Sequence, residues 1–300
     1  MSSYSYLKNG DILPMVSILQ LLLNRQIEGK IIGVDGVFGP KTRKAVSDFQ
    51  HLRHIPKKGI VDRRTWLRLI EGTGLKIIDS VDVTEEWLDN PEMTLDPFRA
   101  IGANPIVVGA MCNGVSEAVR QIVQRVGNGS NLLLLRFHGH GAAGIQGVTD
   151  GTGEFENKRG EKVNVYSDEL SSIASDNLKN LLPDLKKLRT VFGIYTCVEM
   201  HGCKVAKGQK GRNFIKILAN RWEVPVSAGI IDQLGGLKSA FRFEGRVFTA
   251  FPHGKNFKTW SAGLPRFAGV CLPWLLDKVE HWELGREALS AFIRKFSYPP

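Results

Sequence analysis

Apolar positions recur every three or four residues through the first seventy residues, the spacing of helices that bury one face. One such run follows Val16, and a second begins near Pro40, where a proline suits the first turn of a helix. A third run covers residues 63–70. Residues 34–40 contain Asp-Gly and Gly-Pro steps, which are typical of a tight loop. The sequence therefore predicts a small three-helix unit at the N-terminus.

The pattern changes after Gly72 and Gly74, where continuous apolar segments begin to alternate with amphipathic ones. The expected strands are residues 75–83, 105–108, 132–137, 191–195, 198–200 and 225–228, with a hairpin-like pair at 242–251. The expected helices are residues 115–126, 178–188, 211–222 and a tail at 273–296. This alternation favours an α/β sandwich with a largely parallel sheet. We therefore divide the chain into domains at 1–72 and 73–300.

Short motifs make the N-terminal unit more specific. They are Asn9-Gly10-Asp11, Leu19-Gln20, Asp35-Gly36-Val37-Phe38-Gly39-Pro40, Phe49-Gln50 and Gly59-Ile60-Val61-Asp62 followed by Thr65-Trp66. Together they resemble the three-helix peptidoglycan-binding domain found on many wall hydrolases. The resemblance implies a groove near the DGxFG loop that holds the peptide stem of the wall polymer, with Asp35, Gly36, Phe38, Gly39 and Trp66 as its motif residues. The alternative is a helical module that keeps this fold but recruits another protein or binds nothing.

The charge balance favours anionic partners. Forty Lys and Arg residues against thirty Asp and Glu residues give a net charge of +10. The basic residues lie in short groups without an aromatic-interleaved stripe, so nucleic acid is not expected as a partner. A wall rich in carboxylates and phosphates fits the charge and the N-terminal motifs together.

The first eleven residues show no cationic start followed by an apolar stretch, so no secretory signal peptide is expected. The longest apolar runs are also too short to span a membrane. Four irregularly spaced cysteines, Cys112, Cys197, Cys203 and Cys271, indicate free thiols and synthesis in the cytoplasm. We therefore expect a protein that acts at the cell wall or in the periplasm after delivery by a secretion or phage-like apparatus.

Two of the expected strands end in reactive residues. The segment His138-Gly139-His140-Gly141 follows residues 132–137, and Gly202-Cys203 follows the strand at 198–200. Parallel strands present their carboxyl ends at one edge of a sheet, so an imidazole and a thiol can face one substrate carbonyl there. A His-Gly strand end followed by a Gly-Cys strand end resembles caspase-like cysteine peptidases. The stretch from Met200 to Gly211 resembles a caspase-like group of bacterial surface and secreted proteins with a GCxVAxGxxG motif, in place of the caspase pattern QAC[RQG]G.

The caspase-like resemblance implies Cys203 as the nucleophile and His140 as the general base. His138, Gly141, Gly202 and Cys197 take supporting positions, and Cys197 is expected to be a small buried hydrophobe. Backbone N–H groups in the turn after Cys203 are expected to stabilise the oxyanion of the transition state.

Three functions remain open from the sequence. The first is a wall-targeted hydrolase that cleaves a peptide or amide bond in a stem peptide or in a protein near the wall. The second is a non-catalytic scaffold or assembly protein that binds the wall. The third is a zinc-dependent amidase or peptidase with His138, His140, His201 and Cys203 as donors. No HExxH helix or CxxC pair supports zinc, so neither a metal nor another cofactor is expected.

Overall fold

The computed structural model describes most of the chain. The described residues are 5–26, 32–56, 58–83, 95–109, 114–149, 153–156, 159–165, 172–233 and 240–267. The helical tail expected at 273–296 lies outside them, as do Cys112 and Cys271.

The three predicted N-terminal helices are confirmed. They are α1 (Pro14–Gln26), α2 (Pro40–Leu52) and α3 (Arg63–Leu69), and β1 (Ser5–Leu7) pairs antiparallel with β2 (Val61–Asp62). Phe38, Phe49 and Trp66 are buried among these elements. Asp62 caps α3, because its carboxylate accepts a hydrogen bond from the backbone N–H of Thr65 at 2.8 Å.

A mostly parallel sheet of six strands follows, as the sequence predicts. Its order is β13-β12-β11-β5-β3-β4, and every neighbouring pair is parallel except β12 and β13. The strands are β3 (Lys76–Asp82), β4 (Ile106–Val108), β5 (Leu132–His138), β11 (Phe192–Met200), β12 (Val226–Gly229) and β13 (Val247–Ala250). The central strand β5 is buried on both faces, which explains its nearly continuous apolar sequence, and β11 is buried from Thr196 to Met200.

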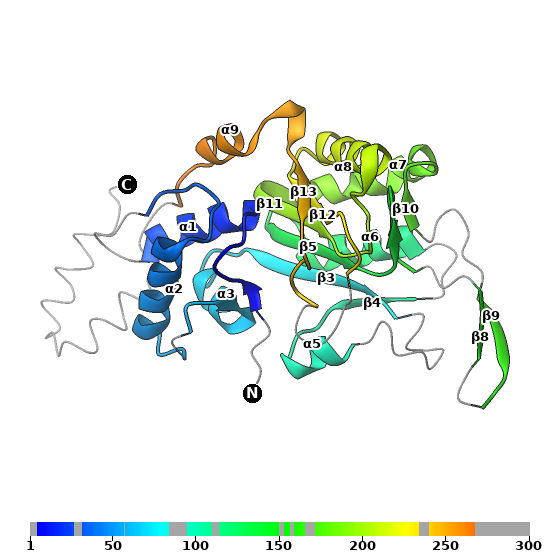
Figure 1. Ribbon diagram of the computed structural model, residues 1–300, viewed down its shortest axis with the longest axis horizontal. Coiled ribbons are helices and arrows are strands. Elements are labelled where there is room, and N and C mark those ends of the chain that lie inside the picture. Colours follow the sequence, from blue (N-terminus) through cyan, green and yellow to red (C-terminus); the bar gives the residue numbers. More distant parts are fainter. Residues whose placement is uncertain are drawn as a thin grey trace, which may run out of the picture.

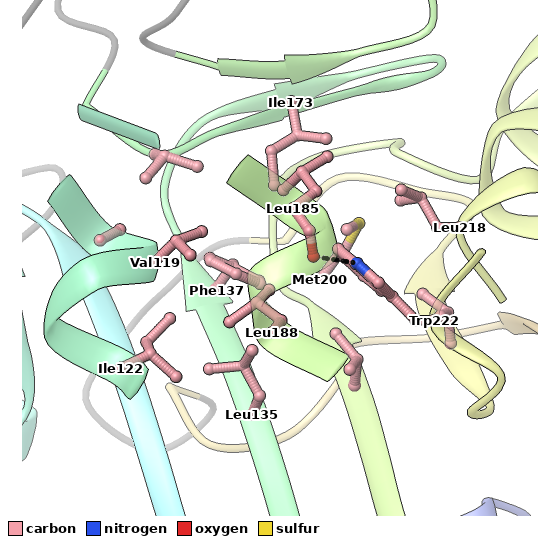
Figure 2. Packing of buried hydrophobic residues seen from close by; sticks show 14 of the residues in the cluster. Val119, Ile122, Leu135, Phe137, Ile173, Leu185, Leu188, Met200, Leu218 and Trp222 are labelled. Carbon is pink, nitrogen blue, oxygen red and sulfur yellow. Dashed lines mark hydrogen bonds between the residues drawn. The ribbon is translucent and has the colours of Figure 1, made fainter. Parts of the chain in front are cut away.

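Three helices cover one face of the sheet: α6 (Gly114–Val126), α7 (Leu178–Lys187) and α8 (Gly208–Trp222). Figure 2 shows Val119 and Ile122 of α6 beside Leu135 and Phe137 of β5. In the same cluster, the indole N–H of Trp222 donates to the carbonyl oxygen of Leu185 at 3.1 Å (Figure 2). This bond joins α8 to α7 over the sheet.

The N-terminal unit packs against the opposite face of the sheet (Figure 1). Leu134 and Cys197 from the central strands belong to one hydrophobic cluster with α1 and α3. Arg242 adds an ion pair across this contact, since its Nη2 lies 2.6 Å from Oδ1 of Asp11. The helix α9 (Phe257–Ala262) lies next to α1, and a Cβ placed on Gly36 would lie 1.9 Å from the ring of Phe257. The N-terminal unit and the sheet thus share a core.

One sequence prediction of secondary structure is wrong. Residues 242–251 do not form a hairpin, because only β13 is a strand and its partner is β12. The backbone of Glu244 is held instead by the side chain of Gln233, whose Oε1 accepts the Glu244 N–H at 2.8 Å. The two segments expected at 191–195 and 198–200 are also one strand, β11, with an irregular register between Phe192 and Cys197.

Several short elements carry no clear sequence signal. They are α5 (Asp96–Ala100), β6 (Gly141–Ala142), β7 (Ile145–Gly147), β8 (Gly153–Glu156), β9 (Lys162–Val165), β10 (Ser172–Ala174) and the 3-10 turns η1 (Leu188–Thr190) and η2 (Pro252–Gly254). Of these, β6, β7 and β10 form a small sheet beside the end of β5. Within the described part of the chain, no helix is long and apolar enough to cross a membrane.

Candidate active site

The two strands with reactive ends are direct neighbours. β5 and β11 pair in parallel, with Phe137 opposite Met200, and the backbone N–H of His201 donates to the carbonyl oxygen of Phe137 at 2.9 Å. The segments that carry His140 and Cys203 therefore leave the sheet at the same edge.

Two glycines let these segments touch. A Cβ placed on Gly141 would lie 2.8 Å from the backbone nitrogen of Cys203, and one on Gly202 would lie 2.7 Å from the carbonyl oxygen of His140. Both distances are too short for a real side chain, because the obstructing atoms belong to the backbone. The glycines thus bring the backbones of His140 and Cys203 together, and both residues are half-buried.

A buried glutamine ties this contact to the small sheet. The side chain of Gln146 accepts the Gly202 N–H at 2.9 Å and donates to the carbonyl oxygen of Gly147 at 2.8 Å. The Gly147 N–H in turn donates to the carbonyl oxygen of His140 at 2.8 Å. Gln146 therefore positions both reactive segments. Sequence reasoning missed it, since a single glutamine in a three-residue strand shows no pattern.

The sulfur of Cys203 faces the loop after β12. The backbone N–H of Gln233 donates to Sγ at 3.2 Å, and Sγ also lies 3.4 Å from the carbonyl oxygen of Gln233. Lys204, the next residue, adopts a left-handed backbone with φ of 56°. A left-handed lysine is strained, and strain of this kind gathers at functional sites.

Several N–H groups in the turn expected to supply oxyanion donors already donate to other groups. In the turn after Cys203, the N–H groups of Lys204, Ala206 and Lys207 donate to carbonyl oxygens at 3.0, 3.0 and 2.8 Å. The Gly202 N–H is held by Gln146. These four donors are therefore engaged in other hydrogen bonds.

A buried charge network lies on the face of the sheet toward the N-terminal unit. The carboxylate of Asp79 accepts hydrogen bonds from Nε and Nη2 of Arg136 at 2.6 and 3.1 Å, and Nε2 of His138 lies 2.9 Å from its Oδ1. Burial disfavours the charged carboxylate, but Arg136 and His138 outweigh that effect and hold the pKa of Asp79 well below its usual range. The guanidinium of Arg136 also stacks 4.2 Å above the ring of Tyr6 from β1. The N-terminal unit thus covers this ion pair.

A second carboxylate and imidazole pair lies beside the first. Nε2 of His201 is 3.0 Å from Oε2 of Glu199, so the two side chains share a face. The rings of His138 and His201 stack with centroids 4.9 Å apart, and His201 also stacks on Phe243 at 4.4 Å. Both histidines are buried, whereas His140 lies at the strand end with partial exposure. Of these three histidines, His140 is therefore the most exposed.

Cys197 lies on the same buried face as this network. Its side chain is 2% exposed, as the sequence predicts for a small hydrophobe. Burial raises the pKa of the Cys197 thiol well above its usual value, and Glu199 raises it further. A thiol in this state is a poor nucleophile.

Protonation of His138 should make the free energy of unfolding depend on pH. Burial lowers the pKa of His138 from 6.5 to about 4 despite the nearby Asp79. The unfolded chain therefore binds a proton at higher pH than the folded chain, and stability falls as the pH drops from about 6.5 to about 4. We expect His138→Gln to flatten the dependence of the unfolding free energy on pH over this range, as measured by urea denaturation. The exposed His253→Gln is the control, and equal flattening in both variants would contradict the assignment.

The described part of the chain shows no cluster of side chains that supports the zinc alternative. Among the described residues, no group of three or more His, Cys, Asp or Glu side chains is arranged to hold a metal ion. His138 and His201 each place Nε2 against a carboxylate.

The loop at Asp35 lies at the surface of the N-terminal unit, where the sequence motifs predict the groove for the peptide stem. Oδ1 of Asp35 accepts from the Gln20 amide at 2.7 Å and from the Val37 N–H at 2.9 Å. Gly36 has a φ of 70°, and a hollow of about 360 Å³ lies between this loop and the start of α2, reaching Gly39 and Lys41. Phe38 and Trp66 are fully buried, so they support this surface and cannot contact a ligand on it.

Comparison with known proteins bears on the N-terminal unit. Residues 13–69 match the family model described as "Putative peptidoglycan binding domain". No curated protein and no solved structure matches the chain. The matched region spans α1, α2 and α3 and contains the loop at Asp35 with its hollow. The N-terminal unit is therefore a peptidoglycan-binding domain, which supports action at the cell wall.

Proposed function

We propose that the chain is a peptidoglycan-targeted, caspase-like cysteine hydrolase that cleaves a peptide or amide bond. The observation that supports this most directly is the contact between the backbones of His140-Gly141 and Gly202-Cys203 at one edge of a parallel sheet. Nucleophile and base on neighbouring strand ends can reach the same carbonyl group.

In the proposed reaction, His140 transfers protons and Cys203 forms the covalent intermediate. His140 accepts the thiol proton, and the sulfur attacks the carbonyl carbon. The oxyanion that forms accepts a hydrogen bond from the Cys203 N–H. The carbon–nitrogen bond then breaks as His140 protonates the leaving amine, which leaves a thioester on Cys203. Water, deprotonated by His140, attacks the thioester, releases a carboxylic acid and restores the thiol.

Gly141, Gly202 and Gln146 position these groups without taking part in bond changes. The glycines set the distance between the two segments, and Gln146 fixes their relative orientation. The stacked rings of His138 and His201 lie at the ends of the same two strands and help to hold these ends in place.

Hydrolysis of purified sacculi by the purified chain tests the proposal. We expect new amino groups to appear, a thiol alkylating agent to stop their release, and a metal chelator to leave it unchanged. Release that the chelator stops would favour the zinc-dependent alternative. No release from sacculi or from wall-associated proteins would favour a scaffold that only binds the wall.

Wall binding should depend on the hollow at Asp35. Val37 is 40% exposed and lines this hollow, so Val37→Asp places a carboxylate where an anionic stem peptide is expected. We expect roughly tenfold weaker sedimentation with purified sacculi, since a buried like charge disfavours the complex. Leu67→Asp on α3 is the matched control, because Leu67 is 44% exposed and does not line the hollow. Equal loss in both variants would contradict this assignment.

A further inference from the structure

A second cavity lies where the peptidoglycan-binding domain meets the edge of the sheet. Its volume is about 750 Å³, within the range of cavities that hold small ligands. Lys8 and Asp11 line it from the N-terminal unit, Arg212 lines it from α8, and residues 242–248 line it from the segment that leads into β13. The cavity therefore belongs to both parts of the chain and is separate from the hollow at Asp35.

Cations dominate the polar lining of this cavity. They are Lys8, Arg212, Arg242 and Arg246, and the acidic side chains that line it are Asp11 and Glu244. Arg242 pairs with Asp11 through Nη2, but its Nε is buried and has no hydrogen-bond acceptor among the described residues. A ligand in the cavity cannot reach this buried nitrogen, so the cations open to a ligand that supplies oxygens are Lys8, Arg212 and Arg246, which are exposed.

The edge strand β13 gives the cavity a second mode of recognition. Val247 and Phe248 line the cavity, and β13 ends the sheet, with β12 as its partner within the described residues. An edge strand can pair with an extended peptide through its backbone, while neighbouring side chains select the peptide. The aromatic ring of Phe248 offers apolar contact beside the cations, whereas that of Phe243 is buried against His201.

We propose that this cavity binds a short acidic peptide, the carboxylate-bearing stem of the wall polymer. Arginine suits a carboxylate because its planar fork donates two parallel hydrogen bonds. Asp11 and Glu244 suit a peptide that carries an amine as well as carboxylates, and they disfavour a uniformly anionic phosphate polymer. The site goes beyond the hydrolase proposal, since it requires no reaction at Cys203.

Titration calorimetry tests the site with the full chain carrying Cys203→Ala, so that binding is measured without turnover. The probe is a synthetic stem peptide with free carboxylates, and the same peptide with amidated carboxylates is the comparison. We expect Lys8→Gln combined with Arg246→Gln to weaken binding of the free peptide about tenfold, because each exposed charge contributes a few-fold. Amidation should weaken binding by a similar factor.

Matched variants separate the site from general charge effects. Lys179→Gln combined with Lys216→Gln removes two exposed charges outside the cavity and should leave the affinity unchanged. Arg212→Gln alone should weaken binding about threefold, which keeps the test decisive if the double variant unfolds. Equal affinity for both peptides, equal loss in the control variant, or binding of a glycerol phosphate polymer in place of the peptide would overturn the proposal.

Discussion

Replacement of Cys203 by alanine is expected to lower kcat/KM for hydrolysis of the wall substrate by at least about a thousandfold. The variant lacks the sulfur that forms the thioester, and removal of a nucleophile commonly costs this much or more. The loss should fall on kcat, because Cys203 does not line the hollow at Asp35, where we expect the wall to bind. The measurement is the initial rate of amino-group release from sacculi.

Cys197→Ala is the matched control for this variant. It removes the thiol that lies on β11 itself, which is buried and whose pKa is raised by burial. We expect Cys197→Ala to keep turnover within a factor of about two, since the thiol takes no part in the reaction. If Cys203→Ala were as active as the unaltered chain, the nucleophile would lie elsewhere.

The second large effect is expected from Asp79→Asn. This variant leaves the guanidinium of Arg136, which is 1% exposed, without its carboxylate partner. Breaking a buried ion pair on one side commonly lowers the free energy of unfolding by about 3 to 5 kcal/mol. Chemical denaturation at neutral pH measures the change.

Two further variants show whether the cost arises from the unpaired charge. Asp96→Asn breaks an ion pair with Arg99 in which both side chains are more than half exposed, and it should change stability by less than about 1 kcal/mol. Arg136→Met in the Asp79→Asn background should restore part of the lost stability, because the unpaired guanidinium is then removed. No difference between the Asp79 and Asp96 variants would show that the buried pair contributes little.

The sequence predicted the main elements because their pattern reflects burial. Strands such as β5 are buried on both faces and read as continuous apolar runs, while α6 shows the periodicity of a helix with one buried face. The loop at Asp35 was also predicted, since its residues act on neighbours close in sequence. Local chemistry was sufficient for these features.

Features that depend on distant partners could not be predicted. The pair of Asp79 and Arg136 joins residues 57 positions apart, and each reads alone as a polar interruption of a strand. The segment expected as a hairpin at 242–251 was misread for the same reason, because Gln233 holds the backbone at Glu244. The contact of Gly141 with Cys203 likewise depends on the pairing of β5 with β11. Sequence could suggest the reactive residues but not the groups that position them.

Labelling with an electrophilic thiol probe, followed by mass spectrometry of the modified peptides, tests the proposed nucleophile most directly. We expect Cys203 to react faster than Cys112, Cys197 and Cys271, and His140→Ala to slow its labelling while His253→Ala does not. Equal labelling rates at all four cysteines, or labelling of Cys203 that is unaffected by His140→Ala, would contradict a His140 and Cys203 pair at the wall-targeted site.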